Sequence, residues 1–171
     1  METWNAIRAR RNVRSYHDQA IAPQDLDQIL EAARRTPSAG NQQAWDFVVC
    51  TDPEQLSQLA RIGPAAGHVA SSAATIALVA PHSDDPQAHD LIQLDLGQAT
   101  MSIMLAAADL GIGSAHVGAH DQELARRLLG FPEDRFCPLL ITLGVPADRP
   151  LTPVQRPNRR PFTDVVHRGH W

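Results

Sequence analysis

The sequence predicts a helix-rich α+β or α/β layer fold in which helices cover a sheet. Helical and extended patterns follow one another along the chain in an order typical of such layers. The composition is 43% hydrophobic but only 5% aromatic, so small and aliphatic side chains must fill the core, which suits closely packed helices. At 171 residues the chain is long enough for one domain and short for two, so we expect a single domain, residues 1–171.

The first part of the chain carries two helical patterns and one strand. A short helix is expected from Trp4 to Asn12, followed by an extended segment to Tyr16. Pro23 opens an amphipathic helix that ends before Pro37. Turn-forming residues then indicate a loop from Thr36 to Ala44, and a strand follows from Trp45 to Thr51.

The central part contains the most apolar segments. Asp52 is expected to cap a helix that runs to about Ile62. The continuous apolar run Ala73–Ala80 indicates a strand covered on both faces. A helix is expected from about Ala88 to Leu110, and because its second half is apolar almost all round, it should be a buried central helix that ends at Gly111.

The last part combines short elements with a long irregular tail. The glycine-rich passage Gly111–Gly118 should contain a short strand, Asp121–Leu129 a capped helix ended by Gly130, and Pro138–Val145 a buried strand. Pro146–Trp171 contains five prolines and is expected to form an arm, which in a dimer could embrace the partner.

Charge and composition exclude several classes of protein. A net charge of −4 gives no general field for nucleic acid. The two cysteines, Cys50 and Cys137, lie in apolar runs, as buried free thiols usually do, which fits a reducing cytoplasm. The N-terminus carries no apolar targeting segment and the apolar stretches are shorter than a membrane span. We therefore expect a cytoplasmic protein with neither a membrane nor a nucleic-acid partner.

Arginines are concentrated near the N-terminus. All fifteen basic residues are Arg, and four of them lie between Arg8 and Tyr16. A guanidinium can bind phosphate through two parallel hydrogen bonds, so an anion site and a solvated helix end both fit this stretch.

Common motifs for other chemistries are absent or imperfect. The passage from Gly111 follows a helix and has His116 at its sixth position, so we reject a dinucleotide fingerprint. The cluster around His82, His89 and Asp90 fits a solvated loop and helix start better than a metal site, and His116 with His120 lies on a probable loop without a shared face. No metal site is predicted.

One wider constellation points to a family. Arg10–Tyr16, then Pro37–Trp45 leading into Phe47–Val49, resembles the opening of the nitroreductase family of FMN flavoproteins. The resemblance continues in Asp95–Ala99 with Leu105–Gly113, in Leu140–Pro146 and in Arg159–His167. These segments span nearly the whole chain in family order. The resemblance implies an α+β fold with a central, mostly antiparallel sheet between helices, in a homodimer that exchanges C-terminal arms and binds FMN at the subunit interface.

The resemblance also implies roles for particular residues. Arginines from both ends of the chain would hold the FMN phosphate together with Asn12, which stands where the family often has Ser. Arg14 would support the pyrimidine edge of the flavin, where a cation favours the reduced ring. A loop of the other subunit would cover the ring and ribityl chain, and a backbone N–H after the buried helix would lie near N5. The implied cofactor-binding residues are Arg10, Arg11, Asn12, Arg14, Pro37, Ser38, Ala39, Asn41, Gln43, Val117, Gly118, Ala119, Arg159 and Arg160.

The implied activity is hydride transfer from NADH or NADPH through flavin N5 to a nitroaromatic, a quinone or a related acceptor, by a ping-pong mechanism. No side-chain acid or base need be catalytic, because the flavin carries the chemistry. Alternatives are dehalogenation, ene reduction or flavin destruction within the same superfamily, a non-catalytic FMN carrier or sensor, and an interaction protein with an acidic partner. Ala44 replaces a proline that is frequent in the family, and the inserted lid of larger members is missing. The sequence therefore does not identify the substrate.

Overall fold

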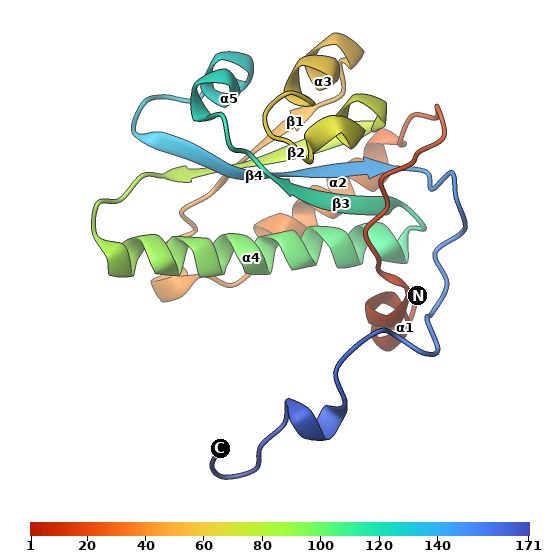
Figure 1. The fold of residues 1–171 in the computed structure, drawn as a ribbon. Helices are drawn as coiled ribbons and strands as arrows, with labels where there is room; N and C mark the ends of the chain where they lie inside the picture. Colours follow the sequence, from red (N-terminus) through yellow and green to blue (C-terminus); the bar gives the residue numbers. More distant parts are fainter.

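The protein is built around a four-stranded antiparallel sheet. The computed structural model describes residues 1–171. Strands β1 (Asp46–Cys50), β2 (Ala74–Pro81), β4 (Arg135–Gly144) and β3 (Gly113–Gly118) lie side by side in that order (Figure 1). All three neighbouring pairs are antiparallel, so the α+β fold with a central antiparallel sheet is confirmed. The α/β alternative is excluded.

Helices cover both faces of the sheet. On one face lie α2 (Pro23–Arg34) and α4 (Pro86–Asp109), and on the other lie α3 (Pro53–Leu59), α5 (Gln122–Leu129) and the short 3-10 helix η2 (Ala66–Ser71) (Figure 1). Each face has its own apolar core. Trp45, Ile76 and Ile103 belong to the core on the α2 and α4 side, whereas Leu59, Val117 and the two free thiols Cys50 and Cys137 belong to the other.

Strand β4 begins earlier than the sequence predicted, at Arg135 rather than Pro138. Leu78 pairs with Leu139 but Ala80 pairs with Phe136, so the register between β2 and β4 shifts at this point. A proline has no N–H to give to a sheet, and Pro138 lies in the irregular stretch. Strand β4 therefore continues through Pro138, which the sequence predicted as its first residue.

Helix α4 is the central helix that the apolar pattern predicted. It begins two residues earlier than expected, because the Asp85 side chain accepts a hydrogen bond from the N–H of Gln87 and so caps it. By length and composition alone this helix could span a membrane. The expectation that every apolar stretch is shorter than a membrane span therefore does not hold for this helix. One side of it is buried against the sheet and α2, with Leu96, Ile103 and Met104 in the core, as in core helices generally.

The N-terminal segment crosses the end of the sheet in an extended form. Helix α1 (Thr3–Ala9) ends three residues before the predicted boundary, and Asn12 then pairs in parallel with Ser114 on β3. Gly113 and Gly144 make room for this segment: a Cβ at Gly113 would lie 2.9 Å from Val13, and one at Gly144 would lie 2.6 Å from the Tyr16 ring.

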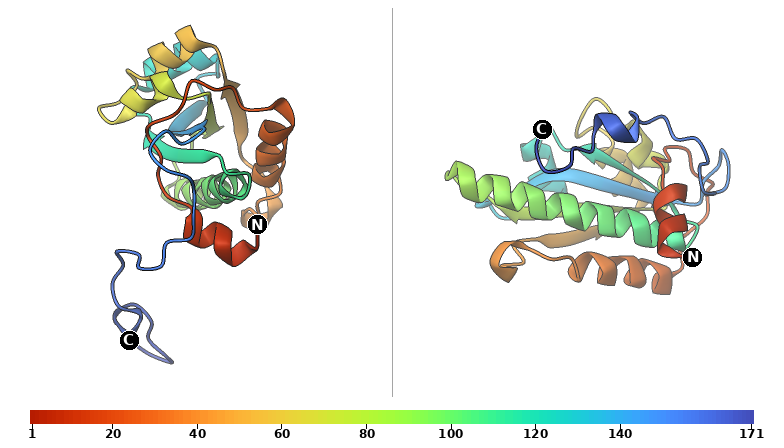
Figure 2. Two further views of the ribbon diagram at one scale, coloured as in Figure 1. Left: turned by 90° about the vertical axis from the view of Figure 1, so that its right-hand side faces the viewer. Right: turned by 90° about the horizontal axis from the view of Figure 1, so that it is seen from below.

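The C-terminal arm leaves the body of the molecule. After β4 the chain passes α1 and continues away from the sheet to the short 3-10 helix η3 (Phe162–Asp164) (Figures 1 and 2). Its apolar side chains Phe162, Val165 and Trp171 are exposed. The arm thus takes the irregular form expected from its prolines.

Candidate functional site

An open groove of about 1050 Å³ lies between α1, α4 and the start of the C-terminal arm. The side chains of Trp4, Ile7, Met101 and Leu105 give it an apolar wall. Four arginines from both ends of the chain line the rest, together with Asn12, and no carboxylate lines it. The arginines are Arg8, Arg10, Arg11 and Arg159. A groove with this lining suits a ligand that is anionic at one end and apolar elsewhere.

Two of these arginines hold the arm in place. Arg8 donates to the Gln155 side chain at 2.8 Å, and Arg11 donates to the Asp148 carboxylate at 2.7 Å and to the Arg149 carbonyl at 2.8 Å. The Arg11 guanidinium lowers the pKa of Asp148 to about 2. Arg11 is therefore occupied within the chain, although it was a predicted cofactor ligand.

Arg10 and Asn12 are available to a ligand. The Arg10 side chain forms no hydrogen bond or ion pair with the chain, and it lines the groove half-buried. The amide oxygen of Asn12 is buried without a hydrogen-bond partner in the chain, which is uncommon in a native protein and makes it a candidate ligand contact. Arg159 lines the groove, whereas Arg160 does not and donates instead to the Asp164 carbonyl at 2.8 Å.

Arg14 lies outside this groove. Its side chain is exposed and has no hydrogen-bond partner in the chain, and its charge acts on Tyr16 and on His68 of η2. The Nε2 atom of His68 is buried and unpartnered. Burial, and secondarily the Arg14 charge, lower the pKa of His68, so its ring is neutral at pH 7.

Tyr16 fixes the end of the arginine segment. Its buried hydroxyl donates to the Val13 carbonyl and lies 2.7 Å from the Thr142 hydroxyl. Burial raises the pKa of Tyr16 to about 12, so the hydroxyl keeps its proton at physiological pH. This anchor holds the extended segment that carries Arg14.

The predicted loop Pro37–Gln43 lies elsewhere in the chain and does not line the groove. The Ala39 N–H donates to both carboxylate oxygens of buried Asp95 in α4, at 3.2 and 3.1 Å, and the Gln43 N–H donates to the Ser38 hydroxyl at 2.9 Å. Asn41 and Gln43 have φ values of 56° and 52°, a backbone region that costs such residues energy. Asp95 thus holds a loop that contains left-handed backbone at two non-glycine residues.

The third predicted group lies at the end of edge strand β3. Val117 and Ala119 are buried and Gly118 is half-buried. The Ala119 N–H donates to the Pro138 carbonyl at 3.0 Å, so this amide is not free for a ligand. Ser114, beside Asn12, is four residues from Gly118, which is about 13 Å along a strand. One elongated ligand could reach both places.

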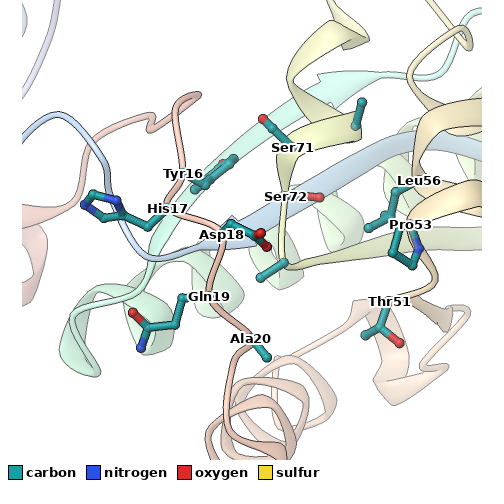
Figure 3. Close-up of a pocket in the computed structure, with 12 residues that line it drawn as sticks. Tyr16, His17, Asp18, Gln19, Ala20, Thr51, Pro53, Leu56, Ser71 and Ser72 are labelled. Carbon is teal, nitrogen blue, oxygen red and sulfur yellow. The ribbon is translucent and has the colours of Figure 1, made fainter.

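A second hollow of about 420 Å³ contains none of the predicted ligands. It lies between the loop Tyr16–Ala20, the start of α3 and the end of η2 (Figure 3). Asp18 points toward its centre and His17 points outward (Figure 3), and no arginine lines it. A carboxylate without a cation does not suit an anionic ligand, so the arginine-lined groove is the better candidate.

Sequence reasoning missed two residues of the candidate site. Asp95 was part of the family resemblance but received no role, and its buried carboxylate orients the loop at Ala39. His68 lies in a glycine-rich passage without periodicity, so no pattern could single it out. Only in the folded chain does the Arg14 charge act on it.

The chain is similar to known proteins in sequence and in fold. The family model described as "Nitroreductase family" matches residues 7–85 and 64–145. A protein of Archaeoglobus fulgidus, named for NADH dehydrogenase or NAD(P)H nitroreductase activity, is 33% identical over 174 residues, which are 99% of each chain. An "FMN reductase [NAD(P)H]" of Bacillus subtilis is 27% identical and is matched over 86% of this chain and 67% of its own length.

A solved structure shows the same fold. The "FMN-dependent Nitroreductase" of Clostridium difficile superposes with a TM-score of 0.84 at 22% identity, over 97% of this chain and 98% of its own. The family match covers well over half of the present chain, and the archaeal relative covers nearly all of it. This chain belongs to the nitroreductase family.

Proposed function

We propose that this protein is an FMN-dependent oxidoreductase that takes hydride from NADH or NADPH and passes two electrons to a nitroaromatic, a quinone or a related acceptor. The observation that carries the proposal is the groove with several arginines and no carboxylate, in a chain of the nitroreductase family. Among its relatives are proteins named as FMN reductase and NADPH-flavin oxidoreductase.

The residues of the groove fit the FMN phosphate. Arg10 and Arg159 would hold it, since both line the groove; Arg10 has no side-chain partner in the chain, and the Arg159 side chain donates only to the neighbouring Asn158 carbonyl, at 2.7 Å. A hydrogen bond to a charged group contributes about 1.5–3 kcal/mol, so one such bond from each guanidinium would contribute about 3–6 kcal/mol to FMN binding. The unpartnered Asn12 oxygen can accept a hydrogen bond from a ribityl hydroxyl.

Bound FMN would supply the two-electron hydride exchange, and the protein would supply binding and charge. Arg14 is an exposed cation without a carboxylate partner, placed beyond Asn12 along the same segment. A cation near the ring lowers the cost of adding negative charge to it. Donor and acceptor would use one open site in turn, which is a ping-pong sequence.

A second copy of the chain would complete the site. The loop Pro37–Gln43 does not reach the groove of its own chain, and α1 and α4 expose Trp4, Ile7, Leu94 and Met101. Exposed apolar residues gathered on two helices are typical of a subunit interface. We propose a cytoplasmic homodimer in which the whole chain acts as one FMN-binding domain.

The test is optical. Purified protein should be yellow, or should bind added FMN stoichiometrically. Under anaerobic conditions NADH or NADPH should bleach it, and menadione or a nitroaromatic should restore the colour. A protein that binds FMN but is not bleached would be a carrier or sensor. A colourless protein that takes up no FMN in titration would contradict the proposal.

A further inference from the structure

The start of the C-terminal arm is joined through its backbone to the arginine segment Arg8–Tyr16. The Ala147 N–H donates to the Ser15 carbonyl at 3.0 Å, and Asp148 follows directly. One carboxylate oxygen of Asp148, Oδ1, accepts a hydrogen bond from the Arg149 N–H at 2.8 Å. The carboxylate of Asp148 is thus held in place by contacts within its own chain.

Arg11 and Arg8 each use a single nitrogen atom to hold the arm. The Nη2 atom of Arg11 donates to Asp148 Oδ1 at 2.7 Å and to the Arg149 carbonyl at 2.8 Å. The Nη2 atom of Arg8 donates to the Gln155 side chain at 2.8 Å. The Nε and Nη1 atoms of both arginines have no partner in the chain, although both residues line the groove and the Arg11 side chain is only 17% exposed. A guanidinium carries five N–H donors in one rigid plane, so holding one nitrogen determines where the other donors point.

The position of Asp148 lets it support Arg11 without blocking the groove. Its carboxylate contacts the guanidinium of Arg11 but does not itself line the groove. An anion in the groove would therefore meet the guanidinium and not the carboxylate. A mobile arginine side chain loses conformational freedom when it binds an anion, and one that is already held loses less. Holding Arg11 in this way thus favours the binding of an anion.

We propose that Asp148 is a positioning residue for the phosphate of FMN: it holds one nitrogen of Arg11, so that docking of the arm and binding of the phosphate strengthen each other. The inference rests on the proposed function, because FMN supplies the anion. The arm also contributes residues to the lining of the groove, and the Val154 N–H donates to the Arg8 carbonyl at 3.0 Å. Coupling between two binding events is reciprocal, so a bound phosphate should in turn stabilise the docked arm.

The test uses two substitutions that separate position from charge. Asp148→Ala and Asp148→Asn both remove the negative charge, but Asn keeps an oxygen that can accept the hydrogen bond from Arg11. Fluorescence titration with FMN should give about tenfold weaker binding for Asp148→Ala and an affinity within about threefold of the wild type for Asp148→Asn. Hydrogen exchange of the Val154 amide should slow when FMN is added to wild-type protein, and should change much less in Asp148→Ala.

Glu31→Ala is the matched control, because Glu31 also pairs with arginines, Arg34 and Arg35, on the surface of α2. It should retain the wild-type affinity for FMN. Unchanged exchange at Val154 in wild-type protein saturated with FMN would overturn the inference without any variant. Unchanged or tighter FMN binding by Asp148→Ala would also overturn it, as would equal losses in the two Asp148 variants, which would assign the effect to charge. If wild-type protein binds no FMN, the proposed function fails and this inference fails with it, whereas FMN binding without these effects rejects the inference alone.

Discussion

At the scale of single residues, the arginine segment separates into distinct tasks. Arg8 and Arg11 bind the C-terminal arm through Gln155 and Asp148. Arg10 lines the groove without a side-chain partner, and Arg14 is an exposed cation outside the groove. Under the proposed function, similar side chains within one short stretch would serve arm docking, anion binding and charge near the ring. Substitutions can separate these tasks.

Arg10→Ala should release FMN, whereas Arg14→Ala should slow flavin reduction more than it weakens FMN retention. Loss of one charged contact to phosphate should weaken binding by about tenfold or more. Fluorescence titration measures the affinity, and anaerobic stopped-flow mixing with NADH measures the reduction. Arg34→Ala is the control, because Arg34 pairs with Glu31 on the surface of α2. Equal behaviour of the Arg10 and Arg14 variants would reject this division.

Tyr16 should make stability depend on alkaline pH. The folded pKa is raised from 10.0 to about 12, so the protonated hydroxyl stabilises the fold fully below pH 10, and this contribution disappears as the pH rises toward 12. Absorbance titration of the single tyrosine should give a midpoint near 12 in folded protein and near 10 in denaturant.

Tyr16→Phe tests the same anchor at neutral pH. It should lower the free energy of unfolding by about 1–2 kcal/mol, because the Val13 carbonyl loses its partner. It should also remove the extra loss of stability between pH 10 and 12. A variant as stable as the wild type in urea would contradict this role.

At the scale of elements, helix α4 carries both halves of the proposed site. Its exposed Met101 contributes to the groove, whereas its buried Asp95 orients the loop at Ala39. The two residues are six positions apart, about 9 Å along the helix. Helix α4 therefore sets the distance between the groove and the loop at Ala39, which in the proposed dimer would reach the groove of the other chain.

Asp95→Ala should loosen that loop without unfolding α4. Two weak contacts to the Ala39 N–H disappear, and the residues with positive φ from Gly40 to Gln43 lose their support. Hydrogen exchange of the Ala39 amide should become at least about tenfold faster, while amides of β2 stay protected. Asp90→Ala, at an exposed position of the same helix, provides the comparison. Unchanged exchange at Ala39 would contradict the role of Asp95.

The elements differ in how far local sequence determines them. The caps at Asp52 and Asp121 and the left-handed Gly111 and Gly130 were predictable, because their causes lie within a few residues. The entry of β4 before Pro138 was not, because pairing with β2 overrides the proline there. For the site, Arg10, Asn12 and Arg159 were predicted and share one groove. His68 depends on contacts that only the tertiary fold creates.

At the scale of the whole molecule, the exposed apolar side chains of α1 and α4 and the extended arm are the surfaces that a second copy of the chain would cover in the proposed homodimer. Leu94→Glu and Met101→Glu should each convert the proposed dimer into a monomer, because a buried carboxylate without a partner costs several kcal/mol. Sedimentation velocity measures the change, and FMN affinity should fall with it. Gln28→Glu adds the same charge to exposed α2 and should leave the dimer intact. A monomeric wild type that retains FMN would refute the shared site.

The two cores can report on unfolding separately. Both thiols lie on the α3 and α5 side, where burial raises the pKa of Cys50 to about 11 and that of Cys137 to about 12. Trp45 lies on the α2 and α4 side. In a variant with Trp4 and Trp171 replaced by Phe, alkylation by iodoacetamide would time the opening of one layer and the emission of Trp45 that of the other. If alkylation and the change in emission occur at the same rate, the sheet couples the two layers into one cooperative unit. If the thiols react first, the α3 and α5 layer opens while the rest of the protein remains folded.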